Sequence, residues 1–486
     1  MHTTDYKRDT NMDQIINKSL LNATCPESDE AIAVINPATD KVLAYIPSVD
    51  TQTIHSLIQA SKQAQILWQQ KTAAERSVIL KRWYDLMVQN ADDLARIMTL
   101  EQGKPLAEAK GEVMYGASFI QWFAEEGKRV YGETIPSPTG DKRLMTIKQP
   151  IGIAAAITPW NFPIAMITRK AAPALAAGCS FIVKPANQTP LSAYATAELA
   201  YQAGLPKDLL VIVNNHSSVA VGEILCTHED IKKLSFTGST EVGRNLINQC
   251  ADTIKRTSME LGGNAPFIVF DDANVEQAVK GAIASKFRNA GQTCVCANRF
   301  YVQDGIYDQF VEKFTAAVAE LKMGNGLEPG VNIGPLVDIK AKKSVLGYID
   351  NAVKQGAKIV LGGKAEQGLF VQPTILTEVT QDMDITQTEL FGPIAPIIRF
   401  YDDQELVEKA NDTIYGLASY FYTENIKRAF NIAEKLEYGM VGINEGLISN
   451  EVAPFGGVKQ SGFGREGAKQ GIDEYLNIKY LCFGGF

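Results

Sequence analysis

A cysteine that follows a Gly-Gln turn is the clearest candidate for a nucleophile in this sequence. The stretch Phe287-Arg-Asn-Ala-Gly-Gln-Thr-Cys294-Val-Cys296 lies between a helical pattern and a strand pattern. A cysteine on such a loop can be exposed and close to backbone N–H groups, which favours the thiolate. Cys294 is therefore a candidate nucleophile, although an inert structural cysteine fits the same pattern.

A glutamate among apolar residues is the candidate general base. Glu260 stands in Met259-Glu-Leu-Gly-Gly263, where desolvation would raise the pKa of its carboxyl group. A raised pKa suits general-base catalysis, but a glutamate before a turn can also be purely structural.

The loop Thr158-Pro-Trp-Asn-Phe-Pro163 follows an apolar strand, where a doubly wound sheet binds its ligands. Asn161 in this loop could donate a hydrogen bond to an oxyanion, or it could only shape a proline-rich turn.

Two further segments are candidates for nucleotide binding. Lys184-Pro-Ala-Asn187 ends one strand pattern, and Phe236-Thr-Gly238-Ser239-Thr-Glu-Val-Gly243 leads from another strand into a helix. A helix N-terminus offers free N–H groups to phosphate, and lysine adds positive charge. The glycine spacing is not G-x-G-x-x-G, so the common dinucleotide fingerprint is absent.

Alternating short strands and helices must position these residues. The apolar patterns predict strands over 151–157, 180–183, 209–213 and 231–236, with helices over 165–177, 191–203 and 241–250. Such alternation predicts a parallel, doubly wound sheet. Before this first series, two packing helices are predicted over 54–69 and 74–103. After it, a second α/β series is predicted from 266–270, 275–288 and 295–302. Two segments, 128–149 and 475–486, fit neither series and are interpreted as extended arms.

Composition limits the class of protein. A chain of 486 residues exceeds the roughly 250–300 residues of one hydrophobic core, so at least two domains are expected. The net charge of −8 without a long basic run argues against nucleic acid as a partner. The longest uncharged stretch, 149–168, is interrupted by three prolines and is interpreted as a buried strand and loop, so no membrane partner is expected.

The termini and the cysteines favour a cytoplasmic protein without a metal. The first residues, MHTTDYKRDTNMDQ, contain no apolar signal core. Seven cysteines without C-x-x-C spacing fit a reducing compartment. None of the four histidines lies near Cys294 or in a glycine-rich stretch, which weakens a zinc site or a Cys–His pairing.

Together the five segments resemble the aldehyde dehydrogenase superfamily in residue type, order and spacing. The resemblance extends from about residue 32 to 486 and includes Thr388-Glu389-Leu-Phe-Gly-Pro393 and Pro454-Phe-Gly-Gly457. Within the superfamily, the succinate-semialdehyde dehydrogenases are the most similar, through Cys294-Val-Cys-Ala-Asn-Arg299, Asn444-Glu-Gly-Leu-Ile-Ser449 and Gly471-Ile-Asp-Glu-Tyr475.

The resemblance implies an α/β fold of the aldehyde dehydrogenase type, with two doubly wound Rossmann-like domains and a small β oligomerisation arm. It places an NAD(P)-binding domain at 14–128 and 150–260, a catalytic domain at 261–457, and the arm at 129–149 and 468–486. A homodimer or a homotetramer is expected.

The resemblance also assigns roles to site residues. Cys294 attacks the aldehyde carbon, the Asn161 side chain and the Cys294 N–H hold the oxyanion, and Glu260 is the general base for thioester hydrolysis. Cofactor contacts are implied for Trp160, Lys184, Asn187, Gly238, Ser239, Leu261 and Glu389. NAD-preferring relatives often have glutamate where Asn187 stands; a neutral amide tolerates a 2′-phosphate, so NADP is expected as preferred cofactor, with NAD also accepted.

The expected substrate is a small carboxylated aldehyde, and the resemblance implies succinic semialdehyde. Its carboxylate contacts are implied to be Arg169, Arg288 and Ser449, with Asn450 as the alternative to Ser449; two arginines and a hydroxyl suit a planar anion. Some relatives use a second thiol as a redox partner, so Cys296 is either that partner or a small core residue.

Three other interpretations compete. Glutaric semialdehyde is one methylene longer, and a methylene shifts discrimination by only about 1–3 kcal/mol. A thiol hydrolase could use the same Cys294 and Glu260 without redox chemistry, but the cofactor segments argue against it. A non-catalytic protein on the same fold would be expected to lack one of these two residues.

Overall fold

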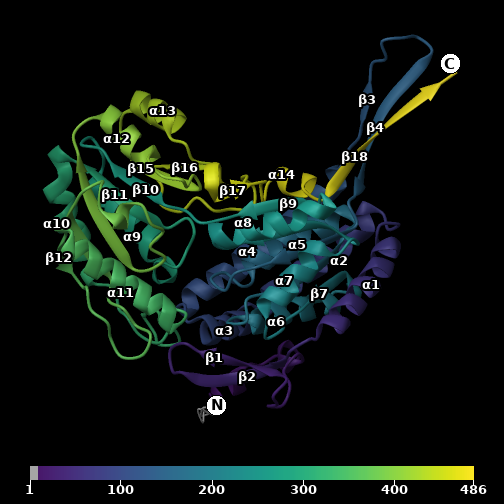
Figure 1. Ribbon diagram of the computed structural model, residues 1–486, viewed down its shortest axis with the longest axis horizontal. Helices are drawn as coiled ribbons and strands as arrows, with labels where there is room; N and C mark the ends of the chain where they lie inside the picture. The colour runs from purple at the N-terminus through teal and green to yellow at the C-terminus, as the bar shows by residue number, and fades with distance from the viewer. Residues whose placement is uncertain (1–8, 486) are drawn as a thin grey trace.

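Two mainly parallel sheets form two lobes, and a narrow β arm projects from one of them (Figure 1). The computed structural model describes residues 9–485. Residues 1–8, where the N-terminal segment without a signal core begins, and Phe486 of the expected arm lie outside the described residues.

The first lobe contains a six-stranded sheet in the order β17-β9-β8-β5-β6-β7. Its strands are β5 Ile153–Ile157, β6 Ser180–Lys184, β7 Leu210–Ile212, β8 Ile231–Thr237, β9 Arg256–Glu260 and β17 Gly462–Phe463. All neighbours are parallel except β17 with β9. The four strands predicted in this lobe are confirmed, and their carboxyl ends meet at one edge because Ile157 pairs with both Lys184 and Phe236.

The second lobe contains a seven-stranded sheet in the order β12-β13-β14-β11-β10-β15-β16. Its strands are β10 Ala265–Val269, β11 Ala297–Gln303, β12 Lys358–Leu361, β13 Thr374–Val379, β14 Ile394–Phe400, β15 Ala418–Tyr422 and β16 Met440–Ile443. Only the edge strand β12 is antiparallel to its neighbour. The predicted fold of two doubly wound α/β units is therefore confirmed.

Helices cover both sheets. In the first lobe they are α1 Thr51–Trp68, α2 Ala73–Gln89, α3 Ala91–Gln102, α4 Leu106–Glu126, α5 Ala165–Ala177, α6 Pro190–Gln202, α7 Ser218–Thr227, α8 Thr240–Cys250 and α14 Gln470–Asp473. In the second lobe they are α9 Val275–Phe287, α10 Tyr307–Ala319, α11 Ile339–Lys354, α12 Asp403–Asn411 and α13 Ile426–Lys435. Within residues 9–485, no helix has both the length and the apolar character needed to cross a membrane.

The single helix predicted over 74–103 is wrong. Asn90 has φ −101° and ψ 17°, and it separates α2 from α3. Two shorter helices result because the chain turns at this non-helical residue. The second of them ends at Gly103, whose φ of 95° is easily adopted only by glycine.

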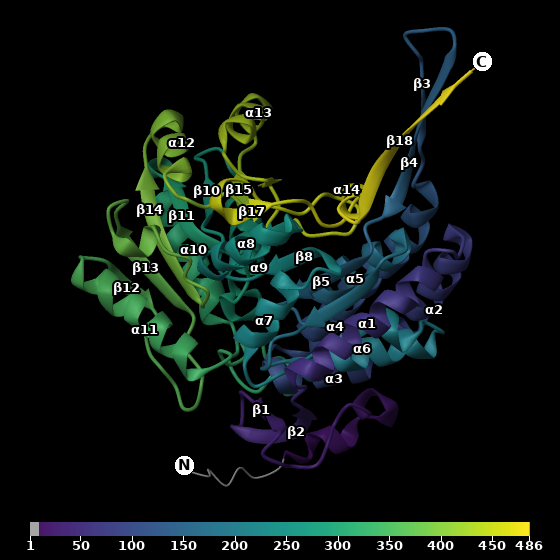
Figure 2. The same ribbon diagram turned by 45° about the vertical axis from the view of Figure 1, so that its right-hand side comes forward.

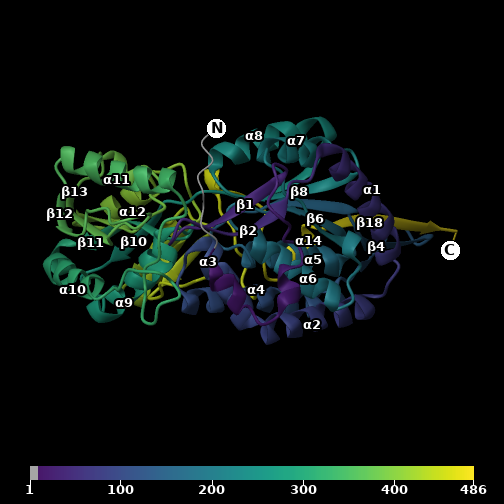
Figure 3. The same ribbon diagram turned by 90° about the horizontal axis from the view of Figure 1, so that it is seen from below.

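The two predicted arm segments lie side by side. Strands β3 Glu133–Ile135, β4 Lys142–Pro150 and β18 Leu476–Gly484 form an antiparallel sheet in the order β18-β4-β3. This sheet extends away from the first lobe and carries the described end of the chain near its tip (Figures 1 and 2). A further hairpin, β1 Ala31–Asn36 and β2 Lys41–Pro47, crosses the junction of the lobes when the molecule is seen from below (Figure 3).

Candidate active site

Cys294 lies on a tightly held loop between α9 and β11. Asn289 and Ala290 have φ of 53° and 54°, so the chain makes a left-handed turn before Gly291. The side chain of Gln292 donates to Asn289 O at 3.1 Å and accepts from Val337 N at 3.0 Å. These hydrogen bonds fix the backbone that presents the thiol.

The expectation that this loop favours the thiolate is not met. Burial raises the pKa of Cys294 to about 12, and the positive charges of Arg169 and Arg288 only partly oppose this rise. Neighbouring segments from elsewhere in the chain remove water from the thiol. The resting nucleophile is therefore a thiol, which needs a base to become reactive.

The surroundings of Glu260 suit the general base expected from the sequence. It is the last residue of β9, and both carboxyl oxygens are buried without a hydrogen-bond partner among residues 9–485. Burial raises the pKa of Glu260 well above its usual value, and the nearby Glu466 carboxylate raises it further. Its charge also raises the pKa of Cys294, so the two groups are neighbours. The desolvation predicted for Glu260 is confirmed.

Asn161 lies against the same loop. Its Nδ2 donates to Gln292 O at 3.0 Å, and its backbone carbonyl accepts from Asn289 Nδ2 at 3.1 Å. One amide hydrogen of Asn161 is thereby occupied, whereas an amide group has two. The second remains available for an oxygen bound next to Cys294.

The expected nucleotide contacts converge at the carboxyl ends of β5, β6 and β8. Lys184 Nζ is buried without an ion-pair partner in the described chain, and desolvation lowers its pKa to about 8. Asn187 Nδ2 donates to Asn215 O at 2.9 Å, while its Oδ1 accepts from Asn214 Nδ2 at 2.9 Å. The side chain of Ser239 caps α8 by accepting from Val242 N at 3.3 Å.

Gly238, which precedes this cap, packs under an aromatic ring. A Cβ at this position would lie 2.4 Å from Cζ of Phe236, so a larger residue would push the ring aside. Leu261, another expected cofactor contact, packs closely against Gly243 of α8: a Cβ at Gly243 would lie 2.5 Å from Leu261 Cδ2. Gly238 and Leu261 therefore both contribute to the packing around the first turn of α8.

Two more expected cofactor residues lie nearer to the thiol. Glu389 accepts a hydrogen bond from Gly263 N at 3.0 Å, and burial raises the pKa of its carboxyl group to about 7. The Trp160 ring meets Phe391 edge to face with centroids 5.6 Å apart. Glu389 also raises the pKa of Cys294, which places it beside the nucleophile.

The two predicted arginines both lie near Cys294. Arg169 is buried on α5, forms an ion pair with Glu466 through Nε, and stacks its guanidinium 4.4 Å from the Phe455 ring centroid. Arg288 lies 5.2 Å from the Phe162 ring centroid and has no hydrogen bond or ion pair among the described residues. A buried or partly buried cation without a partner is suited to an incoming anion.

The loop after β16 gives different environments to Ser449 and Asn450. Asn450 Oδ1 accepts from Val452 N at 3.1 Å and from Ala453 N at 2.8 Å, so it shapes the turn. Ser449 is half-buried, and its hydroxyl has no hydrogen bond within residues 9–485. The serine is thus the freer of the two residues.

Cys296 is buried two residues after the nucleophile. Its Sγ contacts Lys286 O at 3.4 Å and Ala297 O at 3.5 Å, and burial raises its pKa. Both Cys294 and Cys296 are free thiols.

The sequence analysis missed the contribution of α4. Glu112 on this helix pairs with Lys104, and its Oε1 accepts from Ile164 N at 3.0 Å. Tyr115, one turn later, lies beside Arg169. The available signal was a run from 106 to 126 with apolar residues at helical spacing and a glutamate on the same face.

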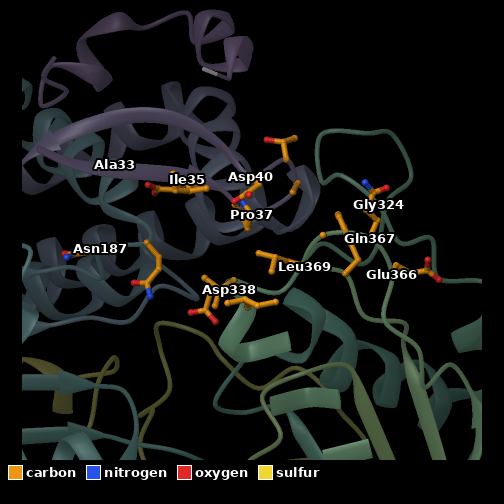
Figure 4. Close-up of a pocket in the computed structure, with 18 of the residues that line it drawn as sticks. Ala33, Ile35, Pro37, Asp40, Asn187, Gly324, Asp338, Glu366, Gln367 and Leu369 are labelled. Carbon is orange, nitrogen blue, oxygen red and sulfur yellow. The ribbon is translucent and has the colours of Figure 1, made fainter. Parts of the chain in front are cut away.

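A cavity of about 1380 Å³ opens where the β1–β2 hairpin faces both lobes. Asn187 lies on its wall together with Ile35, Asp338 and Leu369 (Figure 4). Asn187 is the one predicted site residue among those that line it. The cavity therefore adjoins the outer end of the expected nucleotide site rather than the thiol.

Comparisons with known proteins agree with this geometry. Residues 24–481 match the aldehyde dehydrogenase family. The chain is 59% identical over 456 residues to glutarate-semialdehyde dehydrogenase of Pseudomonas putida, covering 94% of this chain and 95% of that protein. It is 58% identical over 472 residues to the NADP⁺ succinate-semialdehyde dehydrogenase of Escherichia coli, covering 97% of each.

A solved structure is similar over the same extent. The aldehyde dehydrogenase of Brucella melitensis superposes with a TM-score of 0.96 at 58% identity, covering 97% of this chain and 99% of that one. The thiol, the buried carboxyl group and the strand ends around them thus occur in a chain that matches one family over residues 24–481. The chain belongs to the aldehyde dehydrogenase family and is an oxidoreductase that oxidises aldehydes through a catalytic cysteine.

Proposed function

We propose that this enzyme oxidises succinic semialdehyde to succinate, with NADP preferred over NAD as the acceptor. The observation that carries the proposal is the pair of guanidinium groups next to Cys294, of which that of Arg288 has no ionic partner in the described chain. Arginine binds a carboxylate through two parallel N–H groups, which gives both energy and orientation. An aldehyde with a carboxylate at its far end would satisfy this charge.

The proposed chemistry uses Glu260 and Asn161 around the thiol. Cys294 Sγ attacks the aldehyde carbon, its proton passes to Glu260, and the free amide hydrogen of Asn161 with Cys294 N–H holds the oxyanion. After oxidation, Glu260 gives that proton up to solvent and then takes a proton from water as the water attacks the thioester carbon. The C–S bond then breaks, the carboxylic acid leaves, and the Cys294 sulfur recovers a proton from Glu260.

The residues around the strand ends fit a nicotinamide dinucleotide. The buried Lys184 cation has no ionic partner in the part of the chain that the structure describes, and the α8 N-terminus presents N–H groups beyond Ser239. Asn187, at the edge of the cavity, carries no negative charge that would repel a 2′-phosphate. Trp160, Gly238, Leu261 and Glu389 would complete the site. When bound, the cofactor supplies the hydride acceptor.

The test is substrate preference in purified protein. We expect kcat/KM for succinic semialdehyde to exceed that for propanal at least tenfold in the wild type. Arg288→Gln should remove most of this preference, whereas Arg82→Gln, at an exposed position on α2, should retain it. Equal turnover of propanal and succinic semialdehyde by the wild type would contradict the carboxylate site but not the dehydrogenase.

Glutaric semialdehyde is the second candidate substrate. A relative of the same similarity bears that name, and one methylene changes discrimination by about 1–3 kcal/mol. Direct comparison of kcat/KM for the two aldehydes decides between them. A hydrolase without redox chemistry would instead cleave esters without reducing either cofactor.

The roles of the lobes and of the arm belong to the same proposal. Residues 14–128 and 150–260 would bind the cofactor, 261–457 would supply Cys294, and 129–149 with 468–486 would join subunits into a homodimer or homotetramer. The cytoplasmic location remains a prediction from the cysteines.

Reversible oxidation of Cys294 and Cys296 would switch the enzyme off. Two thiols and one peroxide molecule give one disulfide and two water molecules, which removes the nucleophile. The Cys296→Ala variant should then fail to recover activity with a thiol reductant after peroxide treatment. A variant with the same loss and recovery as the wild type would reject the switch.

A further inference from the structure

The hydroxyl group of Tyr115 is a buried donor that the proposed chemistry has not used. Its ring lies on α4 and packs edge to face against Phe119 with centroids 4.9 Å apart. Tyr115 Oη forms no well-formed hydrogen bond among residues 9–485, and the neighbour that acts on it as a hydrogen-bond partner, Arg169, can only donate. The hydroxyl hydrogen therefore lacks an acceptor, which indicates a group that arrives from outside the chain.

Close helix packing places this hydroxyl in the carboxylate site. A Cβ at Gly116 would lie 2.8 Å from Ile164 Cγ2 and 3.1 Å from Thr168 Oγ1, so α4 touches the start of α5. Tyr115, the residue before this contact, is thereby brought next to Arg169 on α5.

The loop that carries Ser449 is tied to the same turn of α4. Ser118 Oγ lies 2.8 Å from Tyr115 O and 3.1 Å from Glu451 Oε2, two residues after Ser449. The tyrosine, the two arginines and the serine therefore come from four separate segments that meet in one region.

The charges around Tyr115 match those around the nucleophile. Burial raises the pKa of Tyr115, and the positive charges of Arg169 and Arg288 lower it in part. The same two arginines lower the pKa of Cys294. Both guanidinium groups are thus neighbours of the hydroxyl and of the thiol, which is the arrangement needed to hold the far end of a short substrate.

The unpaired groups in this region include three donors. Arg169 Nη2 is buried without a hydrogen-bond partner, as is Tyr115 Oη, and the Arg288 guanidinium also has none in the described chain. Only an acceptor with several lone pairs can satisfy all of them at once, and a carboxylate has about four acceptor sites. The Glu466 carboxylate is already engaged by Arg169 Nε and Lys170.

We propose that Tyr115 is a specificity-determining residue that donates its hydroxyl hydrogen to the substrate carboxylate beside Arg169 and Arg288. The proposal rests on the proposed oxidation of a carboxylated aldehyde. It adds a neutral donor from α4 to the charged donors of α5 and of the loop after α9.

The test is Tyr115→Phe, which keeps the ring and its contact with Phe119 but removes the hydroxyl. We expect KM for succinic semialdehyde to rise at least tenfold with kcat changed less than threefold, and kcat/KM for propanal to stay within twofold. The inhibition constant of succinate against propanal oxidation should rise by a similar factor. Tyr84→Phe on α2, outside the site, should match the wild type in all three.

The outcomes separate this inference from the proposed function. A wild type that prefers succinic semialdehyde, with a Tyr115→Phe variant of unchanged KM and succinate inhibition, overturns the role of Tyr115 alone. A wild type without that preference overturns both. Equal losses with propanal and with succinic semialdehyde would mean that the hydroxyl is structural, which also overturns the inference. Succinate inhibition of propanal oxidation reports on the site even if the variant is less stable.

Discussion

At the scale of single residues, burial favours the neutral forms of both the proposed nucleophile, Cys294, and its proposed base, Glu260. Burial raises the pKa of Cys294 to about 12 and the pKa of Glu260 well above 4.5. A thiol and a carboxylic acid cost less to bury than two anions. Reaction then requires the form of the enzyme in which Glu260 has lost its proton and can take that of the thiol.

This arrangement predicts how activity depends on pH. Since the pKa of Glu260 is raised, its base form appears only above that raised value, and kcat/KM should increase with pH through it. Glu260→Gln should lose this limb of the profile and about 10²–10⁴-fold of the rate. Glu434→Gln, exposed on α13, is the control and should retain the wild-type profile. An unchanged profile in Glu260→Gln would exclude Glu260 as the base.

Charge at position 187 should control the choice of cofactor. Asn187→Glu places a carboxylate at the edge of the cavity, where it would repel a 2′-phosphate. We expect the ratio of kcat/KM for NADP to that for NAD to fall at least tenfold. Gln188→Glu adds the same charge at the adjacent exposed residue and should have a smaller effect. Equal changes in both variants would show that the charge acts only at long range.

At the scale of elements, the connection from β9 to β10 supports the nucleophile loop. A Cβ at Gly263 would lie 2.3 Å from Cys294 O, and it can be accommodated only by a shift of the Cys294 backbone. A displacement of about 1 Å costs on the order of 10²-fold in rate. Gly263→Ala should therefore lower kcat about 100-fold, measured at saturating substrate.

The matched control is Gly111→Ala on α4. Nothing lies within 4 Å of a Cβ there, and alanine stabilises a helix interior by about 0.5–1 kcal/mol relative to glycine. This variant should keep the wild-type kcat and unfold at the same or a slightly higher temperature. Full activity in Gly263→Ala would mean that the loop can yield without moving the thiol.

At the scale of the whole molecule, the arm exposes apolar side chains far from either lobe. Ile478, Tyr480 and Phe483 are 70%, 57% and 46% exposed, and they lie on β18 of the sheet that projects from the first lobe (Figure 1). Exposed apolar side chains on strands that project from a fold mark a surface for another chain. A second copy of this chain is the proposed partner.

Glutamates introduced on the exposed apolar face of the arm should weaken association and therefore lower the molar mass of the protein in solution. Ile478→Glu combined with Phe483→Glu should give smaller particles than the wild type in size-exclusion chromatography with light scattering. Ile426→Glu, at an equally exposed residue on α13, should leave the mass unchanged. A monomeric wild type, or a double variant of unchanged mass, would contradict the role of the arm.

Local sequence was sufficient to predict the strands that surround the site and the motifs at their ends. The apolar runs before Thr158, Lys184 and Gly238 predicted parallel strands, and parallel strands necessarily bring their carboxyl ends to one edge. The positions of Asn161, Glu260 and Cys294 followed from short motifs next to those strands. These features depend on neighbours within a few residues, which is why the sequence alone could determine them.

Only the tertiary structure decided the electrostatics and the far end of the substrate site. The pKa of Cys294 depends on Arg169, Arg288 and Glu389, which are brought together by folding, so a motif that suggested a thiolate could not reveal a buried thiol. Tyr115 acquires its proposed role only because Gly116 lets α4 touch α5. How strongly a group is desolvated, and whether a donor finds an acceptor, depend on residues that are distant in sequence and that only folding brings together.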